Sequence, residues 1–207
     1  MKDIVVIEGA DGSGKTTVVD QLASRFPDLR VMVRREPGST AFGEHARALL
    51  IDPEIPMTRL ATMLLFGACR AQLVAEILRS ADQFDLLLLD RYWFSTVAYQ
   101  AFGGGLSIDQ VMAMNRLTDS VEVDGRSLQL NPRLCFYLDV DEQTAEQRKA
   151  HRQKDRFEAA NQAFQRRVRT GYEYMVSQHQ LQRVDATQPI QQVVDALHDQ
   201  IRQNLSP

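Results

Sequence analysis

The segment Gly9-Ala10-Asp11-Gly12-Ser13-Gly14-Lys15-Thr16 follows an apolar run at residues 4–7 and precedes a helical pattern. A strand, a glycine-rich turn and a helix in this order are typical of a phosphate-binding loop. The glycines let the backbone turn its N–H groups toward phosphate oxygens, and the next helix directs its positive end at the anion. In such loops the lysine reaches the β- and γ-phosphates and the Thr16 hydroxyl can hold Mg²⁺. The chain is therefore predicted to bind a nucleoside triphosphate.

Four further apolar runs, at residues 31–33, 86–89, 134–138 and 181–184, predict strands that are buried on both faces. Helical spacing of apolar residues separates them, most clearly in a long helix over residues 58–79 and in a last helix that begins near Pro189. Alternating strands and helices predict a three-layer α/β/α fold around a five-stranded parallel sheet. A length of 207 residues suits one domain, residues 1–207.

The composition of the chain indicates which kinds of partner and which cellular compartment to expect. The net charge of −3 gives no electrostatic reason to expect a nucleic acid partner. No apolar run approaches the roughly 20 residues of a membrane span, and a strand pattern begins almost at the N-terminus, so neither a membrane nor a signal peptide is expected. The two cysteines, Cys69 and Cys135, lack metal-binding spacing and are expected to be reduced, as in the cytoplasm.

Charged residues follow the predicted strands at the edge of the sheet where ligands collect. Arg35-Glu36-Pro37-Gly38 follows the second strand, and Asp90-Arg91-Tyr92 follows the third. Arginine grips phosphate through two parallel hydrogen bonds, and Asp90 can act on Mg²⁺ through water. Structural ion pairs are the alternative for both motifs. Several charged strand ends beside a phosphate loop favour a site for two phosphate groups.

Two helical patterns suggest a base pocket. Phe66 and Arg70 are one turn apart, so an aromatic ring could stack on a base while the guanidinium meets an exocyclic oxygen. The alternative is a core phenylalanine with a surface arginine. A second set either lines a sugar and base pocket or simply begins a helix: Ser95, Thr96, Tyr99 and Gln100.

A basic run falls between the fourth and fifth predicted strands. Five cations occupy nine positions: Arg148, Lys149, Arg152, Lys154 and Arg156. Such a run is either a solvated helix face or a mobile lid over ATP that neutralises charge on the transferred phosphoryl group. The phosphate loop has no arginine of its own, which favours the lid.

In this order the motifs resemble the thymidylate kinase family of nucleoside monophosphate kinases, over essentially the whole chain. The combination of the R-E-P-G, D-R-Y and D-R-x-E patterns is far more specific than the phosphate loop alone. The matching segments are residues 8–17, 35–38, 66–70, 90–92, 95–96, 98–100, Asp155-Arg156-Phe157-Glu158 and Asp185-Ala186-Thr187-Gln188-Pro189.

The resemblance implies a P-loop kinase fold with a short helical lid at about residues 148–158, and transfer of the ATP γ-phosphoryl group to dTMP with Mg²⁺. Lys15 and Thr16 would hold the triphosphate and the metal. The implied ATP-binding residues are Gly9, Ala10, Asp11, Gly12, Ser13, Gly14, Lys15, Thr16, Thr17, Asp185 and Gln188, with the last two beside the adenine.

For the acceptor, the resemblance implies a phosphate clamp of Arg35 and Arg91. Asp11 would face the sugar and phosphate, and Tyr99 would crowd the 2′ position. The base would stack on Phe66, meet Arg70 through its O4, and be read by Thr96 or Gln100, with Ser95 nearby. The family usually forms homodimers; a face of the 58–79 helix with Leu64, Cys69 and Leu73 is the expected contact.

The implied catalytic cations are Lys15, Arg91 and a lid residue, with Arg152 first and Arg148 and Lys154 behind it. Ser39 and the 101–106 loop depart from the family pattern near the acceptor pocket, so dUMP or a 5-substituted deoxyuridylate stays open as the acceptor. Two other classes remain: a deoxynucleoside kinase with Glu8 or Asp90 as base, and a nucleotide-gated switch.

Overall fold

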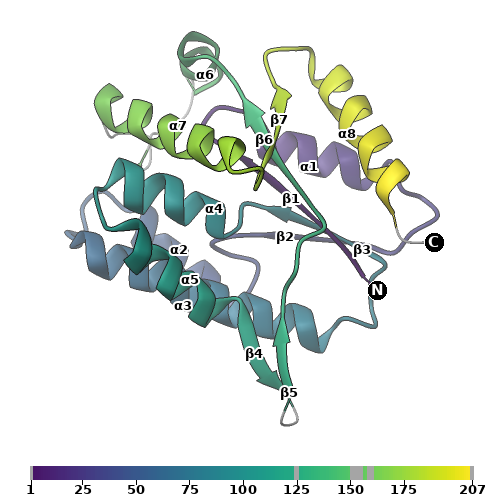
Figure 1. Ribbon diagram of the computed structural model, residues 1–207, viewed down its shortest axis with the longest axis horizontal. Coiled ribbons are helices and arrows are strands. Elements are labelled where there is room, and N and C mark those ends of the chain that lie inside the picture. The colour runs from purple at the N-terminus through teal and green to yellow at the C-terminus, as the bar shows by residue number, and fades with distance from the viewer. Residues whose placement is uncertain (1, 124–125, 150–155, 158–160, 206–207) are drawn as a thin grey trace.

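A parallel five-stranded sheet forms the centre of the computed structural model, which describes residues 2–123, 126–149, 156–157 and 161–205 (Figure 1). The strand order is β2-β3-β1-β6-β7, and every neighbouring pair is parallel. All five predicted strands are therefore confirmed. Their bounds are β1 Asp3–Gly9, β2 Val31–Arg35, β3 Leu86–Asp90, β6 Leu134–Asp139 and β7 Gln182–Asp185.

Helices cover both faces of this sheet, which confirms the three-layer prediction. Side chains of β1 alternate: Val5 and Ile7 belong to one apolar cluster, and Ile4 and Val6 to the other. The first cluster includes residues of α1 (Lys15–Ala23) and α8 (Ile190–Asn204). The second includes residues of α3 (Arg59–Arg79), α5 (Ile108–Thr118) and α7 (Gln162–Ser177). Burial on both faces explains the apolar runs of the inner strands β1 and β3, whereas the edge strands β2 and β7 are only partly buried, so the expectation of full burial is wrong for these two.

Several elements were not predicted from the sequence. They include a two-stranded antiparallel hairpin, whose signal was the alternation of Val121 and Val123 before an Asp-Gly dipeptide. The π-helix that follows α4 carries Tyr99 and Gln100. The bounds are α2 Ala41–Ile51, α4 Trp93–Thr96, π-helix η1 Val97–Gly103, β4 Ser120–Val123, β5 Arg126–Gln129 and α6 Glu142–Lys149.

The long helix α3 begins after Thr58, whose hydroxyl accepts a hydrogen bond from the Ala61 N–H at 3.1 Å. It is long and apolar enough to cross a membrane, yet half of that window is buried inside the fold. The expected dimer face on this helix is wrong for two of its three residues. Cys69 and Leu73 are each 1% exposed because they pack inside the chain, whereas Leu64 is 54% exposed.

Close packing of α7 on η1 depends on Gly171, where a Cβ would lie 2.9 Å from the Ala98 Cα. We expect Gly171→Ala to destabilise the fold by about 2 kcal/mol in urea unfolding, because backbone must move to admit the methyl group. Gly67→Ala is the matched control, since its Cβ would approach side chains rather than backbone: the flexible Met114 most closely, and Thr118 Cγ2 at 3.4 Å. Better helix propensity offsets that contact, so we expect a change within about 0.5 kcal/mol. Equal losses in the two variants would contradict the packing argument.

Candidate active site

The phosphate loop connects β1 to α1 and lines a cleft of about 420 Å³. Gly14 caps α1 with φ 87°, and within the described residues no side-chain cap bonds to the first turn of this helix. Gly12 has φ 88°, and a Cβ there would lie 2.5 Å from the Ala145 carbonyl oxygen, so only glycine fits. The free N–H groups and the positive helix end suit a phosphate.

Lys15 is held with its ammonium group at the loop. Its Nζ donates to the Ala10 carbonyl oxygen at 2.9 Å and lies 3.4 Å from Ser13 Oγ. Burial and the positive charge of Arg91 together lower the pKa of Lys15 to about 8, against the attraction of Asp11. A bound polyphosphate would replace the lost solvation and favour the charged lysine.

Thr16 and Asp90 fit a magnesium ion. The Thr16 hydroxyl donates to Asp90 Oδ2 at 2.7 Å, and both residues line the cleft. Within the described ranges, no group of three or more His, Cys, Asp or Glu residues could hold a metal alone. Magnesium is usually held by one or two oxygen ligands plus substrate phosphates, so this small set of oxygens suits it.

Arg91 is held by four acceptors among the described residues. Its Nη1 donates to the Gly9 carbonyl oxygen at 3.0 Å and to Ser95 Oγ at 3.1 Å, and lies 3.4 Å from the Tyr172 hydroxyl. Its Nη2 donates to Asp11 Oδ1 at 2.5 Å. The Asp90-Arg91-Tyr92 motif therefore does contain a structural ion pair, which joins Arg91 to Asp11. Burial of Asp11 opposes the charge of its carboxylate, but the cations Arg91 and Lys15 hold the pKa of Asp11 below its usual value.

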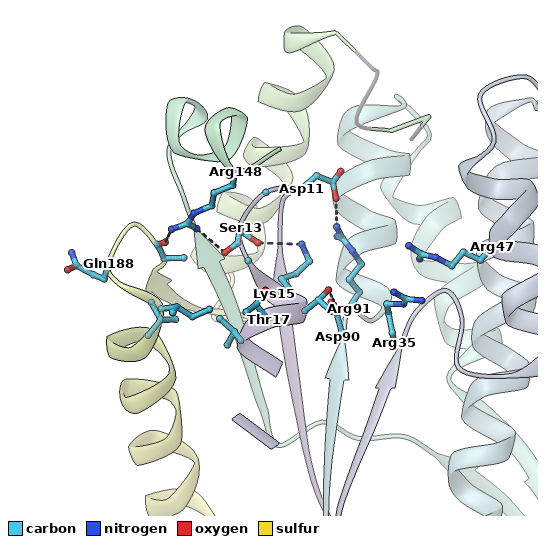
Figure 2. A pocket seen from close by; sticks show the side chains of 17 residues that line it. Asp11, Ser13, Lys15, Thr17, Arg35, Arg47, Asp90, Arg91, Arg148 and Gln188 are labelled. Atoms are coloured by element: carbon cyan, nitrogen blue, oxygen red, sulfur yellow. Dashed lines mark hydrogen bonds and ion pairs between the residues drawn. The ribbon is translucent and has the colours of Figure 1, made fainter. Parts of the chain in front are cut away.

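Two more arginines line the same cleft. Arg35 ends β2, and its guanidinium lies 3.8 Å from Glu44, a loose surface ion pair. Arg47 comes from α2 and donates to the Pro37 carbonyl oxygen at 3.1 Å. In Figure 2, Arg35, Arg47 and Arg91 lie on one side of Lys15, and Arg148 and Gln188 lie on the other.

The residues expected to lie beside the adenine are at the opposite end of the cleft from Arg35 and Arg47. Arg148 Nη2 donates to the Ala186 carbonyl oxygen at 2.9 Å, and its Nη1 lies 3.4 Å from the Ser13 carbonyl oxygen. Gln188 and Thr17 line the cleft, whereas Asp185 accepts hydrogen bonds from Thr187 and Gln188 beside it. Gly9 and Ala10 contribute their carbonyl groups to Arg91 and Lys15. Arg152 and Lys154 lie outside the described residues.

An aromatic pocket adjoins the cleft and shares Asp11, Arg47 and Arg91 with it. The Tyr99 hydroxyl donates to Asp11 Oδ2 at 2.8 Å. The predicted acceptor residues come together here, since the lining includes Phe66, Ser95, Thr96, Tyr99 and Gln100.

Arg70 lies behind this pocket and is fully buried, so the surface-arginine alternative is wrong. Its Nη1 donates to Asn115 Oδ1 at 2.5 Å, and its Nη2 donates to Thr96 Oγ1 at 2.6 Å and to Glu36. Glu36 and Thr96 both line the pocket, so the guanidinium is held directly beneath that wall.

Comparison with known proteins agrees with this geometry. The family model described as thymidylate kinase matches residues 7–197. The chain belongs to the thymidylate kinase family. A thymidylate kinase of Synechococcus sp. (strain RCC307) is 37% identical over 97% of this chain and 96% of the relative. One from Deinococcus radiodurans is 40% identical over 81% and 80%, and one from Chlorobium chlorochromatii is 35% identical over 96% and 91%.

Sequence reasoning missed Glu8 as the organiser of this thymidylate kinase site. Its carboxylate accepts from the Tyr92 N–H at 2.7 Å, Ser95 Oγ at 2.7 Å and the Tyr172 hydroxyl at 2.9 Å. Burial raises the pKa of Glu8, against the pull of Arg91 and these donors. By accepting these bonds, Glu8 orients Ser95 and Tyr172, whose hydroxyl groups contact Arg91. The only sequence signal was a carboxylate inside an otherwise apolar strand.

Arg47 and Phe157 were also missed as pocket residues. Arg47 lines both cavities, and Phe157 lines the aromatic pocket with its ring centroid 5.8 Å from that of Phe66. The position of Arg47, twelve residues after Arg35 on a helix that was not predicted, gave no local sign that it would return to the cleft.

Proposed function

We propose that this chain transfers the γ-phosphoryl group of ATP to dTMP, giving dTDP for dTTP synthesis. One observation carries the proposal: the phosphate-loop cleft and the aromatic pocket share Asp11, Arg47 and Arg91. A cationic junction between a triphosphate site and an aromatic pocket suits an acceptor that carries both a base and a phosphate.

The chemistry at this junction needs no side-chain base, because the acceptor is already a phosphate anion. An acceptor phosphate oxygen bonds to the γ-phosphorus while the bond from that phosphorus to the β-phosphate oxygen breaks, releasing ADP. Lys15 would hold the β- and γ-phosphates, and Arg35, Arg47 and Arg91 would hold the acceptor phosphate. Positioning and charge neutralisation then supply the catalysis. Magnesium, held by Thr16 and through water by Asp90, would neutralise phosphate charge.

The acceptor pocket supports a deoxyribonucleotide. We place the base against Phe66, with its edge toward Thr96 or Gln100. Arg70, expected to meet O4, does not line the pocket and supports this wall through its hydrogen bond to Thr96. Ser95 lines the pocket beside Arg91. Tyr99 is fixed by Asp11 at 2.8 Å, so its ring cannot easily yield to a ribose 2′-hydroxyl.

Neither of the two carboxylates expected to serve as the base of a deoxynucleoside kinase, Glu8 and Asp90, lines the aromatic pocket. The Glu8 carboxylate is occupied by Tyr92, Ser95 and Tyr172 and lines neither cavity. Asp90 lines the phosphate cleft, where Thr16 donates to it, but not the aromatic pocket. Both observations favour a monophosphate acceptor.

We further propose a single domain with a lid at about residues 148–158, acting as a cytoplasmic homodimer without nucleic acid or membrane partners. Exposed apolar side chains on α2 and α3 offer a contact between copies: Phe42, Leu49, Leu60 and Leu64.

The lid cation gives a specific expectation. Arg148 is already engaged at Ser13 and Ala186, on the adenine side, so we assign it to ATP binding. We expect Arg152→Ala to lower kcat by about 10³-fold, the loss seen for a cation that acts on the transition state. Arg148→Ala should mainly raise KM for ATP. Steady-state kinetics of both variants test this, and near-normal kcat in Arg152→Ala would remove it from catalysis.

The function is tested by ADP release from Mg-ATP with separate acceptors. We expect strong activity with dTMP, weak activity with dCMP, dGMP and UMP, and none with thymidine. Rates with dUMP and 5-substituted deoxyuridylates show how strongly the pocket depends on the 5-methyl group. Activity on thymidine without activity on dTMP would establish a nucleoside kinase instead, and ADP release without any acceptor would indicate a switch.

A further inference from the structure

The D-R-F-E segment has two described residues, Arg156 and Phe157, and the function above gives Arg156 no role. Its backbone N–H donates to the Ile51 carbonyl oxygen at 3.0 Å. Its Nε donates to the Asp52 carbonyl oxygen at 3.2 Å, and its Nη2 donates to the carbonyl oxygens of Asp52 and Ile55. All of these acceptors lie at the end of α2 or just after it, about a hundred positions earlier in the chain.

The end of α2 suits a cation from elsewhere. A helix leaves its last carbonyl groups without partners inside the helix, and they carry partial negative charge. The last turn of α2 contains no basic residue, and its C-cap, Asp52, is extended with ψ 115° rather than left-handed. The usual glycine-type cap is therefore absent from this helix end, and Arg156 supplies donors and positive charge there.

Phe157 follows directly and forms part of the aromatic pocket. Its ring lies edge-on to Tyr99 with centroids 5.9 Å apart, and 5.8 Å from the Phe66 centroid. On the other side, Gln165 Nε2 of α7 donates to the Phe157 carbonyl oxygen at 2.7 Å. Phe157 is thus connected to α2 through the contacts of Arg156, and to α7 through its own carbonyl group.

We propose that Arg156 is a positioning residue for the acceptor: by capping α2 it holds Phe157 as a wall of the pocket that receives the nucleobase. The inference rests on the proposed function, which assigns this pocket to dTMP. Arg156 itself does not line the pocket, so we assign its contribution to acceptor affinity to Phe157. Neither residue lines the phosphate-loop cleft, so we expect loss of the cap to change dTMP affinity and to leave ATP affinity nearly unchanged.

The test measures dTMP affinity by calorimetry without ATP, together with KM for both substrates. Methionine at position 156 keeps the length of the side chain but removes the donors and the charge. Loss of hydrogen bonds to a charged group is expected to weaken dTMP binding by about 10- to 30-fold, with KM for ATP unchanged. Arg156→Lys, which keeps the charge and can reach a carbonyl group, should recover part of the loss and serves if Arg156→Met does not fold.

A double-mutant comparison separates positioning from general support of the fold. Since Arg156 acts through Phe157, Arg156→Met added to Phe157→Ala should weaken dTMP binding no further. Arg30→Met is the control, because Arg30 also donates to a carbonyl oxygen, that of Asp82 at 2.8 Å, but it precedes β2 and lines neither cavity. The proposal is overturned if the double variant loses dTMP affinity by the product of the two single-variant factors. It is also overturned if Arg156→Met raises KM equally for ATP and dTMP.

Phe66→Ala distinguishes failure of this inference from failure of the proposed function. If Phe66→Ala loses dTMP affinity while Arg156→Met retains it, the pocket assignment stands and the positioning role is wrong. If wild type and Phe66→Ala bind dTMP equally, the pocket does not receive the base, and the proposed function of these residues fails as well.

Discussion

We expect Lys15→Met to lower kcat/KM for ATP by about 10⁴-fold, within the range for loss of a cation that acts on transferring phosphate. The lysine is held by the Ala10 carbonyl oxygen at 2.9 Å and is the cation at the centre of the cleft. Its folded pKa is depressed, so burying the charged form opposes folding at pH 7. The variant should therefore keep the stability of the unliganded protein while losing turnover, as measured by ADP release and thermal unfolding.

Lys2→Met is the control, because Lys2 pairs with Asp85 at 3.6 Å, away from the cleft. It should leave turnover unchanged. Retention of more than a tenth of the wild-type kcat/KM by Lys15→Met would contradict the assigned role.

The same lysine sets a pH dependence for ATP binding. In the free protein the pKa of Lys15 lies at about 8. Below that pH the lysine is already charged, so ATP binding adds no proton to it. Above pH 8 the free lysine is neutral, and the polyphosphate must draw a proton onto it. ATP affinity should fall between pH 7 and pH 9, with proton uptake at pH 9 that calorimetry in two buffers detects and Lys15→Met abolishes.

We expect Arg91→Met to lower kcat/KM for dTMP by about 10⁴-fold, since the proposed position of its guanidinium between two phosphates would serve both binding and charge neutralisation. Arg91 lines both cavities and is already oriented by Gly9, Ser95 and Asp11. Its loss also leaves the Asp11 carboxylate, 13% exposed, without its ion pair. Steady-state kinetics with dTMP as the varied substrate measure the effect.

Arg91→Lys separates charge from geometry. An ammonium group keeps the charge but cannot form the two parallel bonds of a guanidinium, so we expect a loss of about 10²-fold. Arg183→Met is the control because Arg183 pairs with Asp139 at 2.7 Å on the surface. Equal activities in the Arg91 and Arg183 variants would exclude Arg91 from the reaction.

Local patterns predicted the parts of the site that lie close together in the sequence. The phosphate loop, the charged ends of β2 and β3, and the spacing of Phe66 and Arg70 each fit within a few residues. Such segments carry their own signal, because strand burial and helix periodicity depend on neighbouring residues. The same patterns could not show that Arg70 is buried, since that depends on Glu36 and Asn115 from other elements.

The layered α/β fold, the nucleotide-binding loop and the family of the chain all follow from local sequence patterns. Three features of the site follow only from the folded chain: Glu8 organises the site, Arg47 joins the two cavities, and Arg156 caps α2. A buried charge is tolerated only beside its partners, and the partners of these residues lie tens to more than a hundred positions away in the sequence. No local pattern records contacts of that kind, because folding alone brings them together.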